Sequence, residues 1–118
     1  MIKLPIEKCK VLVAAEPEDL AVEDHFNTEN AELDKQLAHK TIDDLNSGNM
    51  YAWFCARVTV SYAGMSESEY LGCCSYDSEK DFIADGGYYM DMAEEARQRL
   101  ELKINELYST FKNLEKIK

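Results

Sequence analysis

The segment from Tyr88 to Ile117 constrains the fold more than any other part of the sequence. Its apolar residues recur every three or four positions, so they line one side of an α-helix. Acidic residues cluster near its start and lysines near its end, an order that suits the helix dipole. A helix of this length is about 45 Å long, whereas an eight-residue strand spans about 26 Å. We therefore predict a long C-terminal helix that extends past the sheet on which it packs.

The apolar stripe of this helix also predicts self-association. The stripe consists of Tyr89, Met92, Ala93, Ala96, Leu100, Ile104, Leu107, Phe111 and Leu114. From Leu100 onward the intervals follow a 4-3-4-3 rhythm, which is typical of a contact between two helices. We predict a homodimer that uses Leu100, Ile104, Leu107, Phe111 and Leu114. The alternative is that a second helix of the same chain covers these residues.

A second pattern, in which alternate residues share a face, predicts a strand over residues 50–62. The face predicted to lie in the core carries Ala52, Phe54, Ala56, Val58, Val60 and Tyr62. The opposite face carries Tyr51, Trp53, Cys55, Arg57, Thr59 and Ser61. After a turn, residues 67–76 are predicted to return as an antiparallel strand, with Leu71 and Cys73 toward the core. Residues 8–15 are predicted to form a third strand.

The remaining segments complete an α+β fold. Residues 28–46 have helical spacing and end at Gly48, which suits the left-handed conformation of a helix cap. Residues 78–81, Ser-Glu-Lys-Asp, match a capping box and predict a short helical turn. We predict one domain, 1–118, in which a three-stranded antiparallel sheet carries two helices on one face in the order β-α-β-β-α. A chain of 118 residues buries enough surface to form a core without metals or disulfides.

The net negative charge of the chain limits the classes of molecule that we expect it to bind. There are 23 acidic residues against 13 basic ones, a net charge of −10, and residues 11–34 hold eight acids with no lysine or arginine. Such a field repels free nucleic acid and anionic membranes, because binding phosphates requires basic side chains, and it attracts basic proteins. The alternative is that the acidity serves only solubility. No apolar run approaches a membrane span and the first residues lack the apolar stretch of a leader, so we expect a cytoplasmic protein.

No pattern in the sequence predicts catalysis or a cofactor. The five glycines form neither a dinucleotide fingerprint nor a P-loop, and the chain has only two histidines. A calcium-loop template fits residues 77–88 in part, but Phe82 replaces its glycine and Tyr88 its bidentate glutamate. We therefore expect no enzymatic activity, no metal and no cofactor. Four cysteines without C-x-x-C spacing are expected to be free thiols: Cys9, Cys55, Cys73 and Cys74.

Aromatic side chains mark a further candidate surface. Tyr51, Trp53, Tyr70 and Tyr76 fall on the sheet face that the two predicted helices leave open. Tyrosine and tryptophan dominate binding hot spots, so this face is a candidate partner-binding surface. The alternatives are that a second copy of the chain, or residues 17–26, closes this face.

Three blocks in the middle of the chain resemble a known family. They read Gly-Asn-Met-Tyr-Ala-Trp-Phe-Cys-Ala-Arg-Val-Thr-Val at 48–60, Glu-Tyr-Leu-Gly-Cys-Cys-Ser-Tyr-Asp-Ser-Glu-Lys-Asp-Phe at 69–82 and Gly-Gly-Tyr-Tyr-Met-Asp-Met at 86–92. In this order they resemble a family of small uncharacterised proteins of bacteriophages and mobile elements. The resemblance carries no activity and no site residues. It implies a role against host defence, since small acidic phage proteins often inhibit such systems, some by mimicking the phosphates of DNA.

Together these patterns predict a non-enzymatic, anti-CRISPR-like protein. It would block a basic host protein, a nuclease or a CRISPR effector, by presenting carboxylates where DNA phosphates dock. One alternative is a dimer that sequesters a nucleotide signal, with Arg57, Arg97 or Arg99 neutralising the phosphate. The other is a generic assembly or regulatory module. The acids expected to contact the host protein are Glu16, Glu18, Asp19, Glu23, Asp24, Glu67, Glu69, Asp77, Glu79, Asp81 and Asp85.

Overall fold

The computed structural model confirms the α+β class, with a three-stranded antiparallel sheet and a long C-terminal helix. It describes residues 1–22, 26, 30–84 and 87–117, so the predictions for Glu23, Asp24 and Asp85 lie outside the described residues. The elements are η1 (Ile6–Lys8), β1 (Lys10–Glu16), α1 (Ala31–Asn46), η3 (Met50–Ala52), β2 (Phe54–Tyr62), β3 (Met65–Cys74), α2 (Glu79–Ala84) and α3 (Tyr88–Ile117), where η marks a short 3-10 helix.

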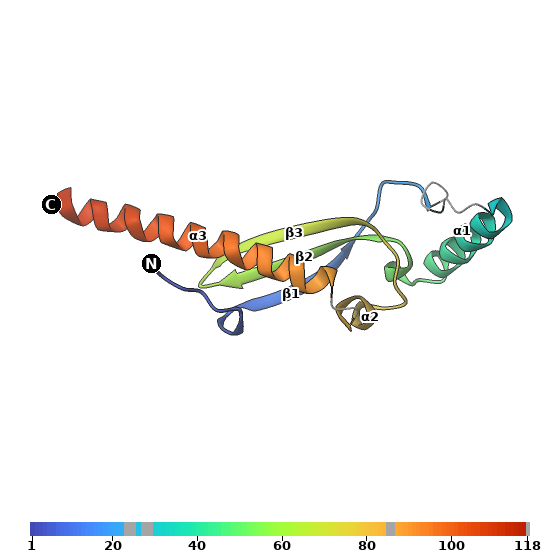
Figure 1. Cartoon of the computed structure of the whole chain (residues 1–118), viewed down its shortest axis with the longest axis horizontal. Coiled ribbons are helices and arrows are strands. Elements are labelled where there is room, and N and C mark those ends of the chain that lie inside the picture. The colour runs from blue at the N-terminus through green and yellow to red at the C-terminus, as the bar shows by residue number, and fades with distance from the viewer. Residues whose placement is uncertain (23–25, 27–29, 85–86, 118) are drawn as a thin grey trace.

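The sheet has the order β1-β2-β3, with β2 in the centre and antiparallel to both neighbours. Figure 1 shows α3 running along this sheet. On β2 the predicted alternation holds as far as Val60, because Ala56, Val58 and Val60 are fully buried while the residues between them are half-buried. Tyr62 was also predicted to lie in the core, but at the end of the strand it is 43% exposed. Across from the buried residues of β2, Ala96 and Leu100 of α3 are also fully buried. Removing these apolar side chains from water provides the main stabilisation of the core.

A β-bulge in β3 changes the predicted pattern near its end. Phe54 pairs with Cys74 and Ala56 with Leu71, so two residues of β3 lie opposite Cys55. The second of them, Cys73, has a φ of +56°. The extra residue shifts the alternation by one position, so Cys74 is buried in the main core. The prediction that Cys73 faces this core is therefore wrong, and Cys73 packs against a second cluster instead.

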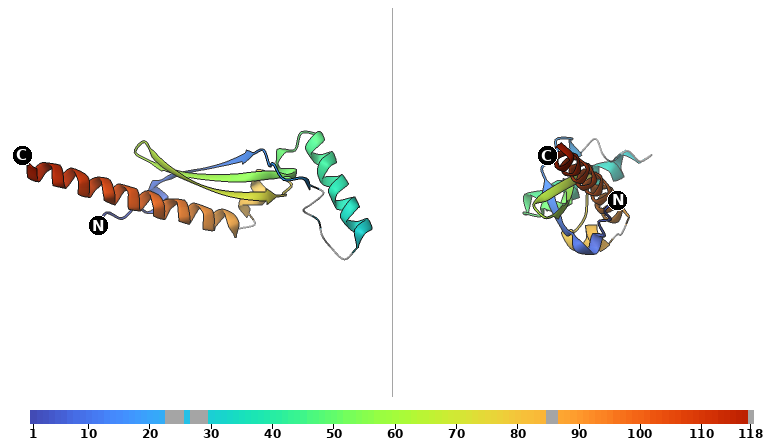
Figure 2. Two further views of the ribbon diagram at one scale, coloured as in Figure 1. Left: turned by 90° about the horizontal axis from the view of Figure 1, so that it is seen from above. Right: turned by 90° about the vertical axis from the view of Figure 1, so that its left-hand side faces the viewer.

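The second cluster explains why α1 does not cover the sheet. In Figures 1 and 2, α1 stands beyond the end of the sheet, whereas two helices were predicted on one face. Ala38 of α1 is buried with Val22 and Trp53, and the Trp53 indole Nε1 donates to the Leu20 carbonyl at 2.9 Å. Trp53, just before β2, provides a separate apolar contact for α1, so α1 docks there and does not cover the sheet. The core face is covered by α3, together with Phe82 of α2 and Leu4 of the N-terminal segment.

The resulting molecule is elongated, measuring 71 × 22 × 22 Å. Figure 1 shows α1 at one end and both chain termini toward the other, with α3 continuing past the sheet. From Glu106 to Lys116 every residue of α3 is exposed. We call Glu106–Ile117 the overhang of α3.

Candidate interaction surfaces

The overhang begins where three polar side chains of α3 hold the N-terminal segment. Asn105 exchanges two hydrogen bonds with the backbone of Ile2, at 2.8 and 2.9 Å. The Leu4 N–H donates to Glu101 at 2.8 Å, and Arg97 donates to the Leu4 carbonyl at 2.8 Å. Because Arg97, Glu101 and Asn105 are spaced four apart, they lie along one side of the helix. The hydrogen bond from Leu4, followed by the Arg97 guanidinium, lowers the pKa of the Glu101 carboxyl.

The apolar stripe of α3 changes from buried to exposed after Ile104. Leu100 is fully buried and Ile104 is half-buried against the core. In the overhang, by contrast, the exposed fractions are 39% for Leu107, 61% for Phe111 and 54% for Leu114. Since α1 docks at the other end of the molecule, the alternative in which it covers this stripe is wrong. The predicted use of these residues in a homodimer stays a prediction.

Several of the predicted partner-binding acids have partners inside the chain. Arg57 lies 3.2 Å from Glu16, and Arg99 lies 3.0 Å from Glu69 and also donates to the Ser68 carbonyl. Hydrogen bonds hold two more carboxylates, because Glu18 accepts from the backbone of Cys73 and Leu20, and Glu79 accepts from the Tyr51 hydroxyl. The remaining described acids are the exposed Asp19, Asp77 and Asp81 and the half-buried Glu67.

Charge is nevertheless unevenly distributed along the molecule. We call described residues 16–22, 26, 30–56 and 71–84 the acidic end, which includes α1, α2 and the adjoining strand ends (Figure 1). It carries ten acids and three lysines, whereas the other described residues carry nine acids and nine bases. The excess negative charge of the described residues therefore lies at the end opposite the overhang.

The predicted aromatic face does not form. Tyr51 packs edge-on against Phe54 with ring centroids 4.9 Å apart, and Tyr76 packs against Phe82 at 5.1 Å. Trp53 is buried against α1 in the second cluster. Of the four residues, only Tyr70, which is 61% exposed, lies on an open surface. The prediction extended strand alternation to positions outside the strands, since Tyr51 lies in η3 and Tyr76 follows β3.

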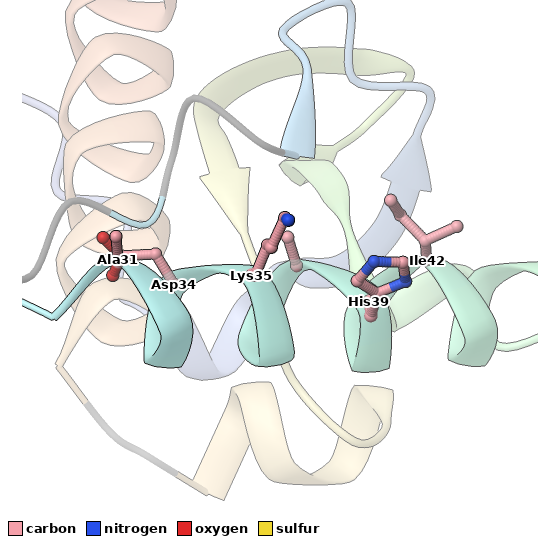
Figure 3. Close-up of a pocket in the computed structure, with 6 residues that line it drawn as sticks. Ala31, Asp34, Lys35, His39 and Ile42 are labelled. Atoms are coloured by element: carbon pink, nitrogen blue, oxygen red, sulfur yellow. The ribbon is translucent and has the colours of Figure 1, made fainter.

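The described residues offer little to hold a small phosphate-bearing ligand. Arg57, Arg97 and Arg99 are all in ion pairs with carboxylates of the same chain. A hollow along α1 measures about 360 Å³, and all of its described lining comes from this one helix (Figure 3). A ligand there would be contacted from one side only, unlike the enclosing pockets that bind small molecules. The lining residues are Ala31, Asp34, Lys35, Ala38, His39 and Ile42.

Among the described residues, the cysteines and the other metal-ligating residue types form no recognisable centre. Within the described part of the chain, no group of three His, Cys, Asp or Glu side chains is placed to hold a metal ion. Cys9, Cys55, Cys73 and Cys74 are free thiols. Burial raises the pKa of the Cys74 thiol, and burial together with the nearby Glu18 carboxylate raises that of Cys55. A raised pKa favours the protonated, less nucleophilic form of the Cys55 and Cys74 thiols.

The chain matches no protein-family model, no curated protein and no solved structure. Of the described helices, none has the length and apolar character needed to cross a membrane. Two surfaces of the described residues are suited to binding a partner, the acidic end and the overhang of α3.

Proposed function

We propose that the protein is a non-enzymatic inhibitor that binds the nucleic-acid-binding surface of a basic protein through its acidic end. The observation that supports this proposal is the charge distribution, ten acids and three lysines in the acidic end against nine of each elsewhere. Lysine and arginine clusters that hold DNA phosphates also bind carboxylates with charge-assisted hydrogen bonds. The acidic end therefore competes with DNA for the same basic groove.

Internal partners prepare this surface for binding. The bonds from Cys73 and Leu20 to Glu18 fix the segment that carries Asp19, and the Asn49 side chain donates to the Asp77 carbonyl at 3.0 Å. Exposed carboxylates on fixed segments lose little conformational entropy when they bind. On this proposal Asp19, Asp77 and Asp81 make the contacts, and the acids with internal partners position them.

The resemblance to phage proteins suggests the kind of target, a host nuclease or a CRISPR effector. The protein itself is expected to leave nucleic acid unbound, because its acidic end repels phosphates. The test measures how the purified protein displaces labelled duplex DNA from a panel of purified nucleases and CRISPR effectors. Inhibition of at least one member is expected, and it should weaken steeply as salt is raised from about 50 to about 200 mM.

A pair of charge-reversal variants makes the test specific. Asp19→Lys with Asp77→Lys changes the acidic end, and Glu7→Lys with Glu106→Lys makes the same change in net charge elsewhere. All four side chains are exposed, so neither double variant disturbs the core. We expect the first variant to lose inhibition and the second to retain it. Equal inhibition by both variants, or no displacement from any panel member, would refute the proposal.

A further inference from the structure

We propose that two copies of the chain associate through their α3 overhangs in an antiparallel, tail-to-tail dimer. The acidic ends of the two copies then lie at opposite ends of a rod. The observation that carries this inference is that a single apolar stripe of α3 is covered by the sheet over its first half and exposed over its second. The dimer does not depend on the identity of any other partner.

The position of the sheet determines the direction of the second helix. Ala93, Ala96 and Leu100 lie on the side of α3 that faces the sheet, and Leu107, Phe111 and Leu114 continue the same side. Figures 1 and 2 show α3 passing from the sheet into the overhang without a break. A parallel second helix would run on into the space that the sheet occupies. An antiparallel helix leaves past the C-terminal end instead, where the body of the molecule does not reach.

The heptad positions give a register for this contact. In antiparallel pairs each a residue packs against a d residue of the other helix. Ile104 then lies opposite Leu114 of the second copy, and Leu107 lies opposite Phe111 of the second copy, which gives four apolar layers by symmetry. Tyr108 flanks the two-fold axis, with the Lys112 ammonium 5.2 Å from the centre of its ring.

Charge favours the same arrangement. The side chains of residues 106–116 include two glutamates and two lysines, so the overhangs do not repel one another. The register brings Glu115 near Glu101 of the second copy, but the Glu101 charge is already compensated by Arg97 at 2.9 Å. The two acidic ends repel each other and are farthest apart in the tail-to-tail dimer. The opposed helix dipoles add a small attraction.

The size of the contact implies a weak dimer. The two overhangs together contribute two tyrosines, two phenylalanines and four aliphatic side chains to the proposed layers and their flanks. An aromatic side chain buries roughly 150–250 Å² when fully covered, and these are partly covered already. The total interface is therefore about 1,000 Å², the lower limit for specific association. We expect a dissociation constant in the micromolar range, so that the monomer predominates in dilute solution.

Sedimentation velocity from about 1 µM to about 1 mM tests the association, since this range brackets a micromolar constant. We expect a reversible monomer–dimer equilibrium. Phe111→Lys with Leu114→Lys should raise the dissociation constant at least about tenfold, because charges replace apolar contacts at the interface. Ser109→Lys with Asn113→Lys, on the other side of the helix, adds the same charge and should leave the constant nearly unchanged. A chain that stays monomeric throughout, or equal effects of both variants, would overturn the proposal.

Small-angle X-ray scattering of the dimer tests the direction of the helices. The monomer is 71 Å long, and an overlap of twelve residues covers about 18 Å, so the antiparallel dimer should measure roughly 125 Å. A parallel dimer would keep a maximum dimension close to that of the monomer. A dimer of that shorter length, or growth into an open polymer, would exclude the tail-to-tail arrangement even if association itself were observed.

Discussion

The Glu18 carboxylate accepts a hydrogen bond from the backbone N–H of Cys73 at 2.6 Å, joining the segment after β1 to the bulge of β3. A second bond from the Leu20 N–H, at 3.2 Å, uses the other carboxylate oxygen. Cys73 has a left-handed backbone, which disfavours it relative to glycine. The carboxylate therefore holds in place a bulge that the strand pairing alone does not satisfy.

Replacing Glu18 tests this role. Glu18→Gln keeps the shape of the side chain but weakens the bond from Cys73, because a neutral acceptor replaces a charged one. We expect the free energy of unfolding to fall by about 1 kcal/mol, as for other exchanges of a charge-assisted bond at a partly exposed site. Urea denaturation followed by tryptophan fluorescence measures it. Glu7→Gln, an exposed acid on η1, is the control and should be neutral; a neutral Glu18→Gln would contradict this role.

Gly72 provides an independent test of the same contact. A Cβ atom at this position would lie 2.9 Å from a Glu18 carboxylate oxygen, which is closer than real contacts allow. Gly72→Ala should therefore push the carboxylate away from Cys73 and destabilise the chain by about 1 kcal/mol. Because both substitutions break one interaction, the double variant with Glu18→Gln should lose less than the sum of the two. Strictly additive losses in urea denaturation would mean that Gly72 acts separately from Glu18.

Trp53 controls the docking of α1 and can be tested locally. Trp53→Phe keeps an aromatic ring in the second cluster but removes the indole N–H that donates to Leu20. We expect amide hydrogen exchange in α1 to accelerate roughly fivefold, as for the loss of about 1 kcal/mol of local stability. Exchange in β2 should stay unchanged, because its core is formed with α3. Tyr70→Phe on the open surface is the control, and a uniform acceleration in α1 and β2 would show that the two clusters open together.

Regular periodicity made much of this fold predictable. The thirty residues of α3 and the buried face of β2 keep a regular spacing of apolar residues without interruption. Both elements can therefore be recognised from the sequence alone. The predictions failed where the repeat is interrupted. Asn49, which accepts from the Tyr51 N–H, begins a 3-10 turn, and Gly72 is the first of the two residues in the bulge. Both are residue types that interrupt strands, and they are the signals that could have revealed these breaks.

The candidate surfaces were predictable to different degrees. The overhang followed from length alone, because a helix of thirty residues exceeds any strand in the sheet. The pairing of individual acids did not, since Glu69 meets Arg99 and Glu18 meets Cys73 only after the chain has folded. Composition gives the net charge, but the distance between residues remote in sequence decides which carboxylates are compensated.

The pH dependence of stability provides the last prediction. The pKa values of Glu18 and Glu101 are lowered chiefly by backbone N–H donors, from Cys73 and Leu4 respectively. A carboxyl whose pKa is lower in the folded state stabilises the protein above its unfolded pKa of 4.5, and this contribution is lost as the pH falls through the folded value. Stability should therefore be constant near neutral pH and decline below about pH 4.5.

Glu101→Gln separates this effect from general acid denaturation. The variant should be less stable than the wild type at pH 7, because the bonds to Leu4 and Arg97 lose their charge-assisted character. At pH 3, which is below the unfolded pKa of 4.5, the difference should shrink, because the contribution of the lowered pKa declines there. Urea midpoints at the two pH values measure it, with Glu106→Gln in the overhang as the matched control. A difference that stays constant with pH would show that Glu101 contributes through shape and not through its charge on the N-terminal segment.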